Sequence, residues 1–422
     1  MAHERCASLV LAGETLAGRP VAEITAVLAA ACARWLDPDD PARREGQGAL
    51  ADHHRVPEPA IARVLDVGFG AWTAEALLDR VRGELGDERA LDDFVALGRC
   101  RRRAFGPRLA VAFASRGVPT TPVGDIIDLL SVKAPVWLKP AAGADDLALR
   151  YAHTVREIDP GIGAAIEVAS WRRGSTAGAA VLESADLVVA TGREETLIEL
   201  GRSVDRDVRT VLHGPRLSAA ILTREAVASD VEACVAALAD DVAFAGQTGC
   251  LSPVVAWVED PDAEQLVSQV HRACVERWPA SPRSESEAEE RAAWSEWMSM
   301  TRVERAAGAA GEVAGGAESG WSIQWRPRAE PPQPPPAPRI LVLAPVTDAV
   351  EAIRLCAAAR GTVATVGVAG PLSRLDSLTP ALARAGVERI AALGRMQQPA
   401  TDWRRDGRPS LADLVRWVDR EY

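Results

Sequence analysis

Residues 108–141, RLAVAFASRGVPTTPVGDIIDLLSVKAPVWLKPA, begin the part of the chain whose pattern indicates the fold. Two short apolar runs in it, Leu109 to Phe113 and Val136 to Leu138, are predicted strands. Further strands are expected at 165–169, 187–190 and 208–212, with helices between them at 145–158 and 194–203. Short apolar runs that alternate with amphipathic segments are typical of βαβ units and a largely parallel sheet. We therefore predict an α/β protein with a doubly wound nucleotide-binding domain.

We place this nucleotide-binding domain at 106–212, and the rest of the chain divides around it. Residues 1–105 have Ala- and Leu-rich patterns and are predicted to be a helical N-terminal region. Residues 213–395 form a second α/β block, the predicted catalytic domain. Within it, 280–338 is rich in Ser, Glu, Ala and Gly and closes with PPQPPPAPR, which predicts an insertion or mobile linker. Residues 396–422 are predicted to form a tail helix. Its apolar face would comprise Leu411, Leu414, Val415 and Val418.

Charge and composition disfavour several classes of partner. The net charge of -11 disfavours nucleic acid, which needs a concentrated positive surface, and the basic run Arg101 to Arg103 is interpreted as a solvated helix end. No apolar run reaches the length of a membrane span, and the N-terminal residues MAHERCASLV do not have a signal-peptide pattern, so we expect a cytoplasmic protein. The seven cysteines are scattered without CxxC spacing, which indicates neither a disulfide framework nor a zinc site.

The segment GQTGCLSP, residues 246–253, follows an amphipathic helix and precedes an apolar strand, so Cys250 is predicted to lie on a tight loop. Glycines there permit unusual backbone angles, and nearby amide groups stabilise a thiolate. Such a thiolate would attack a thioester carbonyl, and backbone N–H groups of the loop would hold the resulting oxyanion. The alternative is that Cys250 is a small buried packing residue.

The nucleotide site must be sought in other residues, because the sequence has no GxGxxG motif. Lys139 ends a predicted strand, where ligands bind in open α/β sheets, and its ammonium group would bond ribose hydroxyls or a 2′-phosphate. Thr191 and Gly192 lie in a strand–turn–helix segment, where the positive end of the helix would contact a pyrophosphate. The alternatives are a merely exposed lysine and an ordinary βα connection.

His213 ends the predicted strand that enters the second block. An imidazole at this position would act as an acid or base near Cys250. The alternative is a histidine whose hydrogen bonds are satisfied by the backbone at a domain junction.

Four segments in this order resemble the aldehyde dehydrogenase superfamily, and most closely its acyl-CoA reductase branch, the LuxC family. They are WLKPA (137–141), ADLVVATGREE (185–195), LHGPRLSAAIL (212–222) and FAGQTGCLSPVVAWVED (244–260). The segment from Arg339, with the ending DGRPSLADLVRWVDREY, is similar to the same branch. The resemblance implies an aldehyde-dehydrogenase-like fold in which a cysteine takes a fatty acyl group and NADPH reduces the thioester to an aldehyde.

By this resemblance, Cys250 would be the acylated nucleophile and Lys139 the contact to the adenosine ribose or its phosphate. Thr191 and Gly192 would lie beside the pyrophosphate or the nicotinamide. Ala142 stands where NAD-preferring relatives often carry an acidic residue, which leaves NADPH acceptable. Leu212 and His213 stand where hydrolytic relatives carry the glutamate that activates water, and the lack of that base favours reduction or transfer over hydrolysis.

Two positions depart from the superfamily pattern. Around Arg116 and Gly117 no asparagine is present for the oxyanion site, so backbone amides, Thr120 or Thr121 would have to replace it. Thr196 replaces the second glycine of the nicotinamide turn.

Two functions are therefore weighed. The first is an NADPH-dependent reductase of a fatty acyl group, taken from an acyl-CoA or an acyl-enzyme donor. Relatives with this architecture are commonly oligomers, so the resemblance also implies a homo-oligomer. The second is a catalytically weak subunit that binds a partner acyl-protein synthetase. Aldehyde oxidation is disfavoured because the hydrolytic glutamate is missing.

Overall fold

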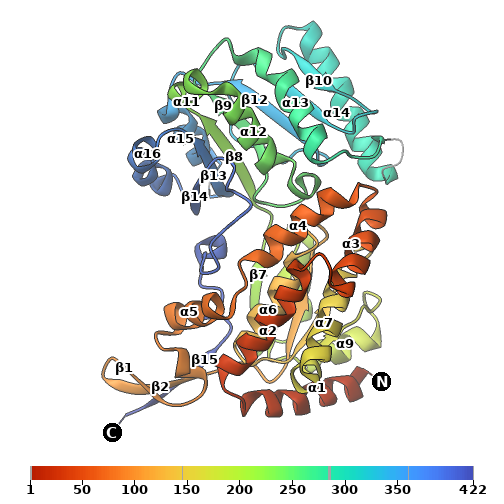
Figure 1. Ribbon diagram of the computed structural model, residues 1–422, viewed down its shortest axis with the longest axis vertical. Coiled ribbons are helices and arrows are strands. Elements are labelled where there is room, and N and C mark those ends of the chain that lie inside the picture. The colour runs from red at the N-terminus through yellow and green to blue at the C-terminus, as the bar shows by residue number, and fades with distance from the viewer. Residues whose placement is uncertain (1, 145, 284–286, 360, 422) are drawn as a thin grey trace. The chain divides into compact units, whose positions relative to one another are not determined.

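The computed structural model describes residues 2–144, 146–283, 287–359 and 361–421, which form two compact units (Figure 1). Unit 1 comprises Met1–His53, Ala62–Pro215 and Ala400–Tyr422. Unit 2 comprises His54–Ile61 and Arg216–Pro399. Each unit has its own parallel sheet and its own apolar core.

Unit 1 is built on a five-stranded parallel sheet with the order β5-β4-β3-β6-β7. Its strands are β3 (Ala110–Phe113), β4 (Val136–Lys139), β5 (Ile166–Val168), β6 (Leu187–Thr191) and β7 (Arg209–His213). The five strands predicted from the apolar runs are confirmed. The chain adds strands outward from β3 in one direction and then returns to add β6 and β7 on the other side. The carboxyl ends at such a reversal are where open α/β sheets bind ligands.

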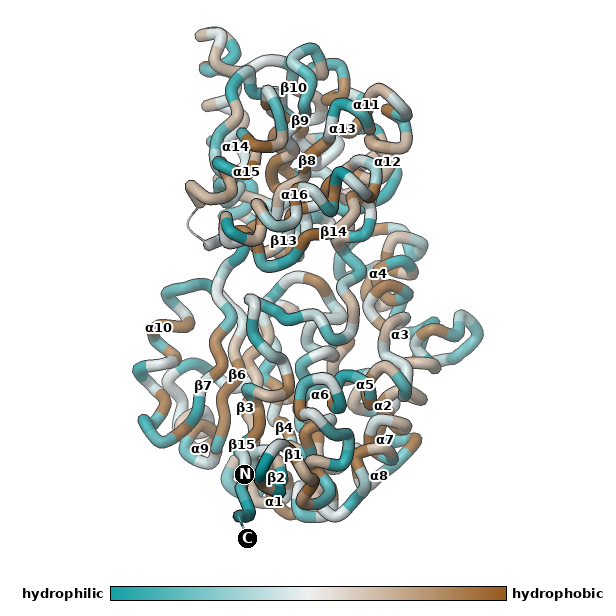
Figure 2. The backbone as a smooth tube through the Cα atoms, turned by 90° about the vertical axis from the view of Figure 1, so that its left-hand side faces the viewer, coloured by the Kyte–Doolittle hydropathy of each residue, from teal (hydrophilic) through white to brown (hydrophobic). Residues whose placement is uncertain are grey.

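Ten helices of the described chain accompany this sheet. They are α1 (Ala2–Ala17), α2 (Val21–Leu36), α3 (Pro41–His54), α4 (Glu58–Gly70), α5 (Ala74–Leu85), α6 (Thr121–Ser131), α7 (Leu147–Ile158), α8 (Pro160–Gly163), α9 (Thr176–Glu183) and α10 (Glu194–Ser203). The predicted helices at 145–158 and 194–203 correspond to α7 and α10, and residue 145 lies outside the described residues. In Figure 2 the strands β3 and β6 carry the hydrophobic colour. Leu109, Val111 and Val188 bury their side chains fully beneath the flanking helices.

A second, three-stranded antiparallel sheet in unit 1 corrects two predictions. It contains β1 (Val95–Leu97), β2 (Cys100–Phe105) and β15 (Arg416–Arg420), in the order β1-β2-β15. The basic run Arg101 to Arg103 is therefore part of a strand rather than a helix end.

The predicted tail helix is wrong, because residues 416–420 pair with β2 and satisfy their backbone groups across the sheet. Leu411, Leu414 and Val415 are buried, but they lie in the turns that precede the strand and not on a helix.

Unit 2 contains a seven-stranded sheet with the order β10-β11-β12-β9-β8-β13-β14, parallel except between β10 and β11. Its strands are β8 (Leu217–Leu222), β9 (Pro253–Val258), β10 (Val313–Gly315), β11 (Ser322–Trp325), β12 (Ile340–Pro345), β13 (Val363–Ala369) and β14 (Arg389–Ala392). Its helices are α11 (Arg224–Ser229), α12 (Val231–Val242), α13 (Leu266–Arg277), α14 (Ala288–Ala306), α15 (Ala349–Ala358) and α16 (Leu372–Arg384).

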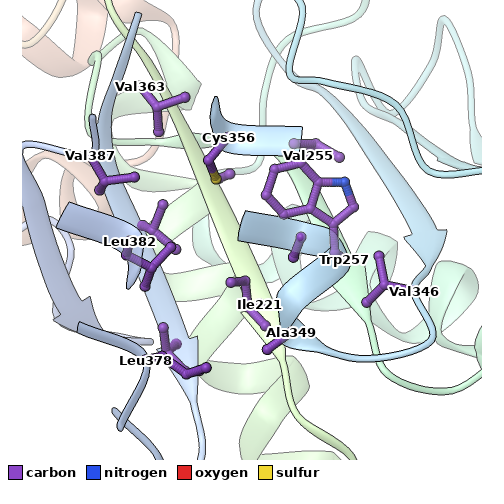
Figure 3. Packing of buried hydrophobic residues seen from close by; sticks show 14 of the residues in the cluster. Ile221, Val255, Trp257, Val346, Ala349, Cys356, Val363, Leu378, Leu382 and Val387 are labelled. Atoms are coloured by element: carbon purple, nitrogen blue, oxygen red, sulfur yellow. The ribbon is translucent and has the colours of Figure 1, made fainter. Parts of the chain in front are cut away.

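The core of unit 2 lies between this sheet and the helices α15 and α16 (Figure 3). Ile221, Val255 and Trp257 come from neighbouring strands, and Cys356 and Leu382 come from the two helices. Trp257, Ile221 and Leu382 are fully buried. This packing fixes the central strands β8 and β9. The segment with Cys250 leads directly into β9.

The segment 280–338 is not a linker throughout. It contributes the 19-residue helix α14 and the strands β10 and β11, and β11 pairs in parallel with β12. The polar composition misled the prediction because Ser322 and Gln324 are buried in this strand and bond to each other. Residues 284–286 lie outside the described part of the chain.

Among the described residues, no single helix has the length and apolar character of a membrane span. The pair α1 and α2 passes that test only together, with a bend of 115° between them.

Candidate active site

The loop that carries Cys250 begins with an unusual backbone. Ala245, Gly246 and Gln247 have φ values of 46°, 65° and 61°, so three successive residues adopt the left-handed conformation. Two of the three are not glycine, and such strain persists only where the surrounding structure holds it. Gly246 has a second reason to be glycine, because a Cβ atom there would lie 2.8 Å from Nε1 of Trp278.

The Gln247 side chain holds this loop against the sheet. Its Nε2 atom donates hydrogen bonds of 2.8 Å to the carbonyl oxygens of Pro253 and of Ile340. Its Oε1 atom accepts one of 2.8 Å from the backbone N–H of Ile340. Because Pro253 begins β9 and Ile340 begins β12, a single buried amide connects the loop to two adjacent strands.

Cys250 itself is anchored through its main chain. The hydroxyl of Ser218, a fully buried residue of β8, donates a 2.6 Å hydrogen bond to the carbonyl oxygen of Cys250. The hydroxyl of Thr248 donates one of 2.7 Å to the carbonyl oxygen of Ala245. The backbone around the sulfur is therefore fixed at the amino ends of β8, β9 and β12.

The exposure of the cysteines separates Cys250 from the other six, all of which lie in described residues. Cys250 is exposed, Cys100 is partly exposed and the remaining five are buried. Burial raises the pKa of Cys32, Cys274 and Cys356 to about 12, which keeps these thiols protonated and unreactive. The alternative prediction, that Cys250 is a buried packing residue, is wrong.

A buried carboxyl group, which no sequence motif indicates, supports the same loop. Asp241, near the end of α12, is 1% exposed and accepts a hydrogen bond of 2.9 Å from the backbone N–H of Met396 and another from that of Gly394. Burial raises the pKa of Asp241 to about 7, and the backbone hydrogen bonds oppose that rise. The Gln397 amide donates to the carbonyl oxygen of Asp241 at 2.7 Å and to the hydroxyl of Ser252 at 3.3 Å.

In unit 1, Lys139 lies at the carboxyl end of β4, as predicted. Its Nζ atom is 5.7 Å from the ring centroid of Phe113 and 5.5 Å from that of Trp171. Both distances are within the range of cation–π attraction. Partial burial lowers the pKa of the Lys139 ammonium group. The lysine ammonium group therefore lies against two aromatic rings, rather than extended into solvent.

Arg116 lies where the superfamily pattern led us to seek an oxyanion asparagine. Its Nη2 atom donates a hydrogen bond to the carbonyl oxygen of Ala142, in the loop that follows β4. The side chain therefore brings a second positive charge to the loop that Lys139 begins.

Thr191 and Gly192 lie at the carboxyl end of β6. Nη2 of Arg405 donates a 3.0 Å hydrogen bond to Oγ1 of Thr191, and the N–H of Gly192 donates one of 3.2 Å to the carbonyl oxygen of His213. The helix α10 begins directly afterwards, with exposed Glu194 and Glu195 in its first turn. These carboxylates weaken the positive end of that helix, although solvent screens them.

His213 ends β7, with its Nδ1 atom 2.6 Å from Oδ2 of Asp406. The side chains are 12% and 9% exposed. Desolvation lowers the pKa of His213 most strongly, the hydrogen bond to Asp406 opposes that shift, and the charges of Arg405 and Arg408 add to it. The imidazole is therefore neutral at neutral pH.

The predicted residues fall into two groups. Lys139, Thr191, Gly192 and His213 lie at the carboxyl edge of one parallel sheet in unit 1. Cys250 belongs to unit 2. The sequence did not indicate Gln247, Ser218, Asp241 or Asp406 as supporting residues, because each acts through a partner that is distant in the chain.

A family model described as acyl-CoA reductase (LuxC) matches residues 16–417. A long-chain acyl-protein thioester reductase of Aliivibrio fischeri is 24% identical over 352 residues, which are 82% of this chain and 71% of that protein. Its counterpart in Vibrio harveyi is 25% identical over 181 residues, 42% of this chain and 37% of that protein.

Solved structures share the fold. An NAD-dependent benzaldehyde dehydrogenase from Corynebacterium glutamicum is 13% identical with a TM-score of 0.70, over 99% of this chain and 89% of that one. An NADP-dependent glyceraldehyde-3-phosphate dehydrogenase from Bacillus halodurans, solved with NADP, is 14% identical with a TM-score of 0.71, over 99% and 90%. The predicted aldehyde-dehydrogenase-like α/β fold is confirmed.

Proposed function

This chain belongs to the acyl-CoA reductase (LuxC) family and is an oxidoreductase acting on acyl or aldehyde groups, and we propose that it reduces a fatty acyl thioester to an aldehyde with NADPH. The observation that carries the proposal is the state of Cys250. Its thiol is exposed and lies on a strained loop that hydrogen bonds connect to β8, β9 and β12.

The first step is transfer of the acyl group to Cys250. The thiolate attacks the acyl carbon of the donor thioester, a new C–S bond forms, and the donor sulfur leaves as its thiol after taking up a proton. Backbone N–H groups of the loop 246–253 hold the oxyanion. His213 is the acid–base group of this step, because its neutral imidazole accepts a proton at neutral pH.

Residues of unit 1 fit a dinucleotide cofactor. Lys139 and Arg116 supply positive charge beside the carboxyl ends of β3 and β4, and Phe113 and Trp171 supply aromatic surface for an adenine ring. Thr191 and Gly192 would hold the pyrophosphate or the nicotinamide. When bound, the cofactor supplies the hydride that converts the thioacyl group to an aldehyde and releases Cys250.

NADPH is proposed over NADH because of the charge around Ala142. The guanidinium of Arg116 reaches the carbonyl oxygen of this residue, and Lys139 begins the same loop. A 2′-phosphate would gain charge-assisted hydrogen bonds from these cations. Ala142 itself offers no carboxylate to repel it.

The donor of the acyl group is proposed to be a long-chain thioester carried on coenzyme A or on a protein. The name of the Aliivibrio fischeri relative, a long-chain acyl-protein thioester reductase, supports the protein-bound form. An acyl-protein synthetase would then be the partner that presents the acyl group.

The test is to follow loss of NADPH absorbance with a series of acyl-CoA thioesters, and to locate the acyl adduct by mass spectrometry. Cys250→Ser abolishes both the adduct and NADPH consumption, whereas the control Cys100→Ser, which alters the partly exposed thiol, leaves both intact. An adduct on another cysteine would refute the site. A wild-type protein that consumes no NADPH with any donor, yet binds an acyl-protein synthetase, would instead support a catalytically weak subunit.

A further inference from the structure

Two consecutive residues of the C-terminal segment contact the carboxyl ends of β6 and β7. Arg405 donates to Thr191 at 3.0 Å, and Asp406 lies 2.6 Å from Nδ1 of His213. One short 3-10 helix, Arg405–Gly407, thus contacts both Thr191, proposed to hold the cofactor, and His213, the proposed acid–base residue.

The backbone of Asp406 is strained. Its φ of 54° places a residue with a Cβ atom in the left-handed region, which only Gly, Asn and Asp adopt with any frequency. The conformation directs the carboxylate to the imidazole and nearly buries it, with 9% of the side chain exposed. A buried carboxylate in contact with one imidazole nitrogen decides which nitrogen carries the proton.

The other imidazole nitrogen has a different environment. His213 lines a pocket within unit 1, and among the described residues no hydrogen bond to its Nε2 atom is present. Charged groups enter this pocket from α6 and from the C-terminal segment. They are Asp125, Asp128, Arg405, Arg408 and Asp413.

We propose that Asp406 is the positioning residue of the acid–base step: it accepts the Nδ1–H of His213 and so leaves Nε2 as the proton acceptor. In the acylation step proposed above, Nε2 then accepts a proton, and the imidazolium, stabilised by Asp406, gives it to the departing donor sulfur. One C–S bond forms, one breaks, and the proton passes from one sulfur to the other. The inference rests on the proposed function, because it needs acylation of Cys250.

The pH dependence follows from the groups that surround His213. Protonation of the imidazole below its lowered pKa would stop acylation, with Arg405 and Arg408 disfavouring the cation and Asp406 favouring it. Burial raises the pKa of Asp125, which also lines the pocket, to about 7, so this neighbour becomes negative as the pH rises through about 7. Loss of the Asp406 charge therefore lowers the pKa of His213 further and shifts the acid limb of the profile to lower pH.

The experiment has one readout that does not involve turnover. Nitrogen-15 NMR of histidine-labelled protein distinguishes the two neutral tautomers, and His213→Gln identifies the signal among the six histidines. Wild type is expected to carry the proton on Nδ1. Asp406→Asn, whose amide tolerates the left-handed backbone and donates as well as accepts, is expected to lose that preference.

The second readout is the single-turnover rate at which an acyl-CoA acylates Cys250, measured against pH. Asp406→Asn slows this rate roughly 100- to 10,000-fold, the range of general acid–base catalysis. It also shifts the acid limb downward. Asp406→Glu restores part of the rate. The control Asp419→Asn alters an exposed carboxylate of the same tail, paired with Arg102, and leaves rate and profile unchanged.

Asp406→Gly protects the test against a folding defect, because glycine adopts this φ without strain. Equal slowing in the Gly and Asn variants, with wild-type melting temperatures, supports the proposal. A wild-type imidazole protonated on Nε2, or an Asp406→Asn enzyme with the wild-type rate and pH profile, overturns it. A wild-type protein that is never acylated defeats the proposed function instead, while the tautomer still shows whether Asp406 positions His213.

Discussion

The amide of Gln247 provides the sharpest test of how the Cys250 loop is held. Gln247→Ala removes three hydrogen bonds of 2.8 Å, two to the carbonyl oxygens of Pro253 and Ile340 and one from the N–H of Ile340. Each buried hydrogen bond contributes about 1 kcal/mol net. The expected cost is therefore about 3 kcal/mol. This value is a lower bound, because Gln247 is 7% exposed and its former partners would be left buried without it.

Hydrogen–deuterium exchange of the peptide that contains Ile340 measures this cost locally. Its N–H bonds directly to Gln247, so a loss of about 3 kcal/mol should speed its exchange roughly 100-fold. The same variant should acylate Cys250 more slowly, because the loop no longer has one conformation. Thr248→Ala is the matched control on this loop: it removes a single part-buried hydrogen bond and should change exchange several-fold at most.

Wild-type exchange at Ile340 in the Gln247→Ala protein would refute this account. It would mean that the strained backbone at residues 245–247 is held by something other than the buried amide.

Three further outcomes are expected. Arg116→Ala weakens NADPH binding about tenfold in a fluorescence titration and leaves NADH binding unchanged; equal loss for both cofactors would remove Arg116 from the phosphate site. Gly246→Ala forces a Cβ atom against Nε1 of Trp278 and should lower the free energy of unfolding by about 1–3 kcal/mol in urea denaturation, and an unchanged midpoint would contradict the clash. Burial raises the pKa of Asp241 from 3.8 to about 7, so the native state retains a proton that the unfolded state releases near pH 4. Stability should therefore fall as pH rises from about 4 through 7, and Asp241→Asn should flatten that slope; parallel curves for variant and wild type would show that Asp241 does not titrate there.

The central strands were predictable because their sequences are continuous apolar runs that can be buried on both faces. The tail was not, since Leu411, Leu414, Val415 and Val418 fit a helical period as well as a turn followed by a strand. Pairing with β2, more than 300 residues earlier in the chain, decided between them. Local pattern cannot report a partner at that distance.

The site was predictable to the same extent. The loop position of Cys250 could be predicted from the glycines that flank it, and the positions of Lys139 and His213 from the ends of apolar runs. Their supports could not, because Gln247 bonds to Ile340, 93 positions later, and His213 bonds to Asp406, 193 positions later. These contacts exist only after the sheets have formed.

The return of residues 400–422 to unit 1 has a practical meaning for anyone who dissects this protein. A recombinant piece that stops after β7 would contain Lys139, Thr191 and His213, yet it would lack the carboxylate beside the imidazole and the third strand of the small sheet. Cofactor affinities measured on such a fragment would not represent the full chain, because the residues that contact Thr191 and His213 would be missing. A fragment that keeps unit 1 intact must join residues 400–422 to the end of β7 through a short designed connector, because segments far apart in the sequence form this one unit.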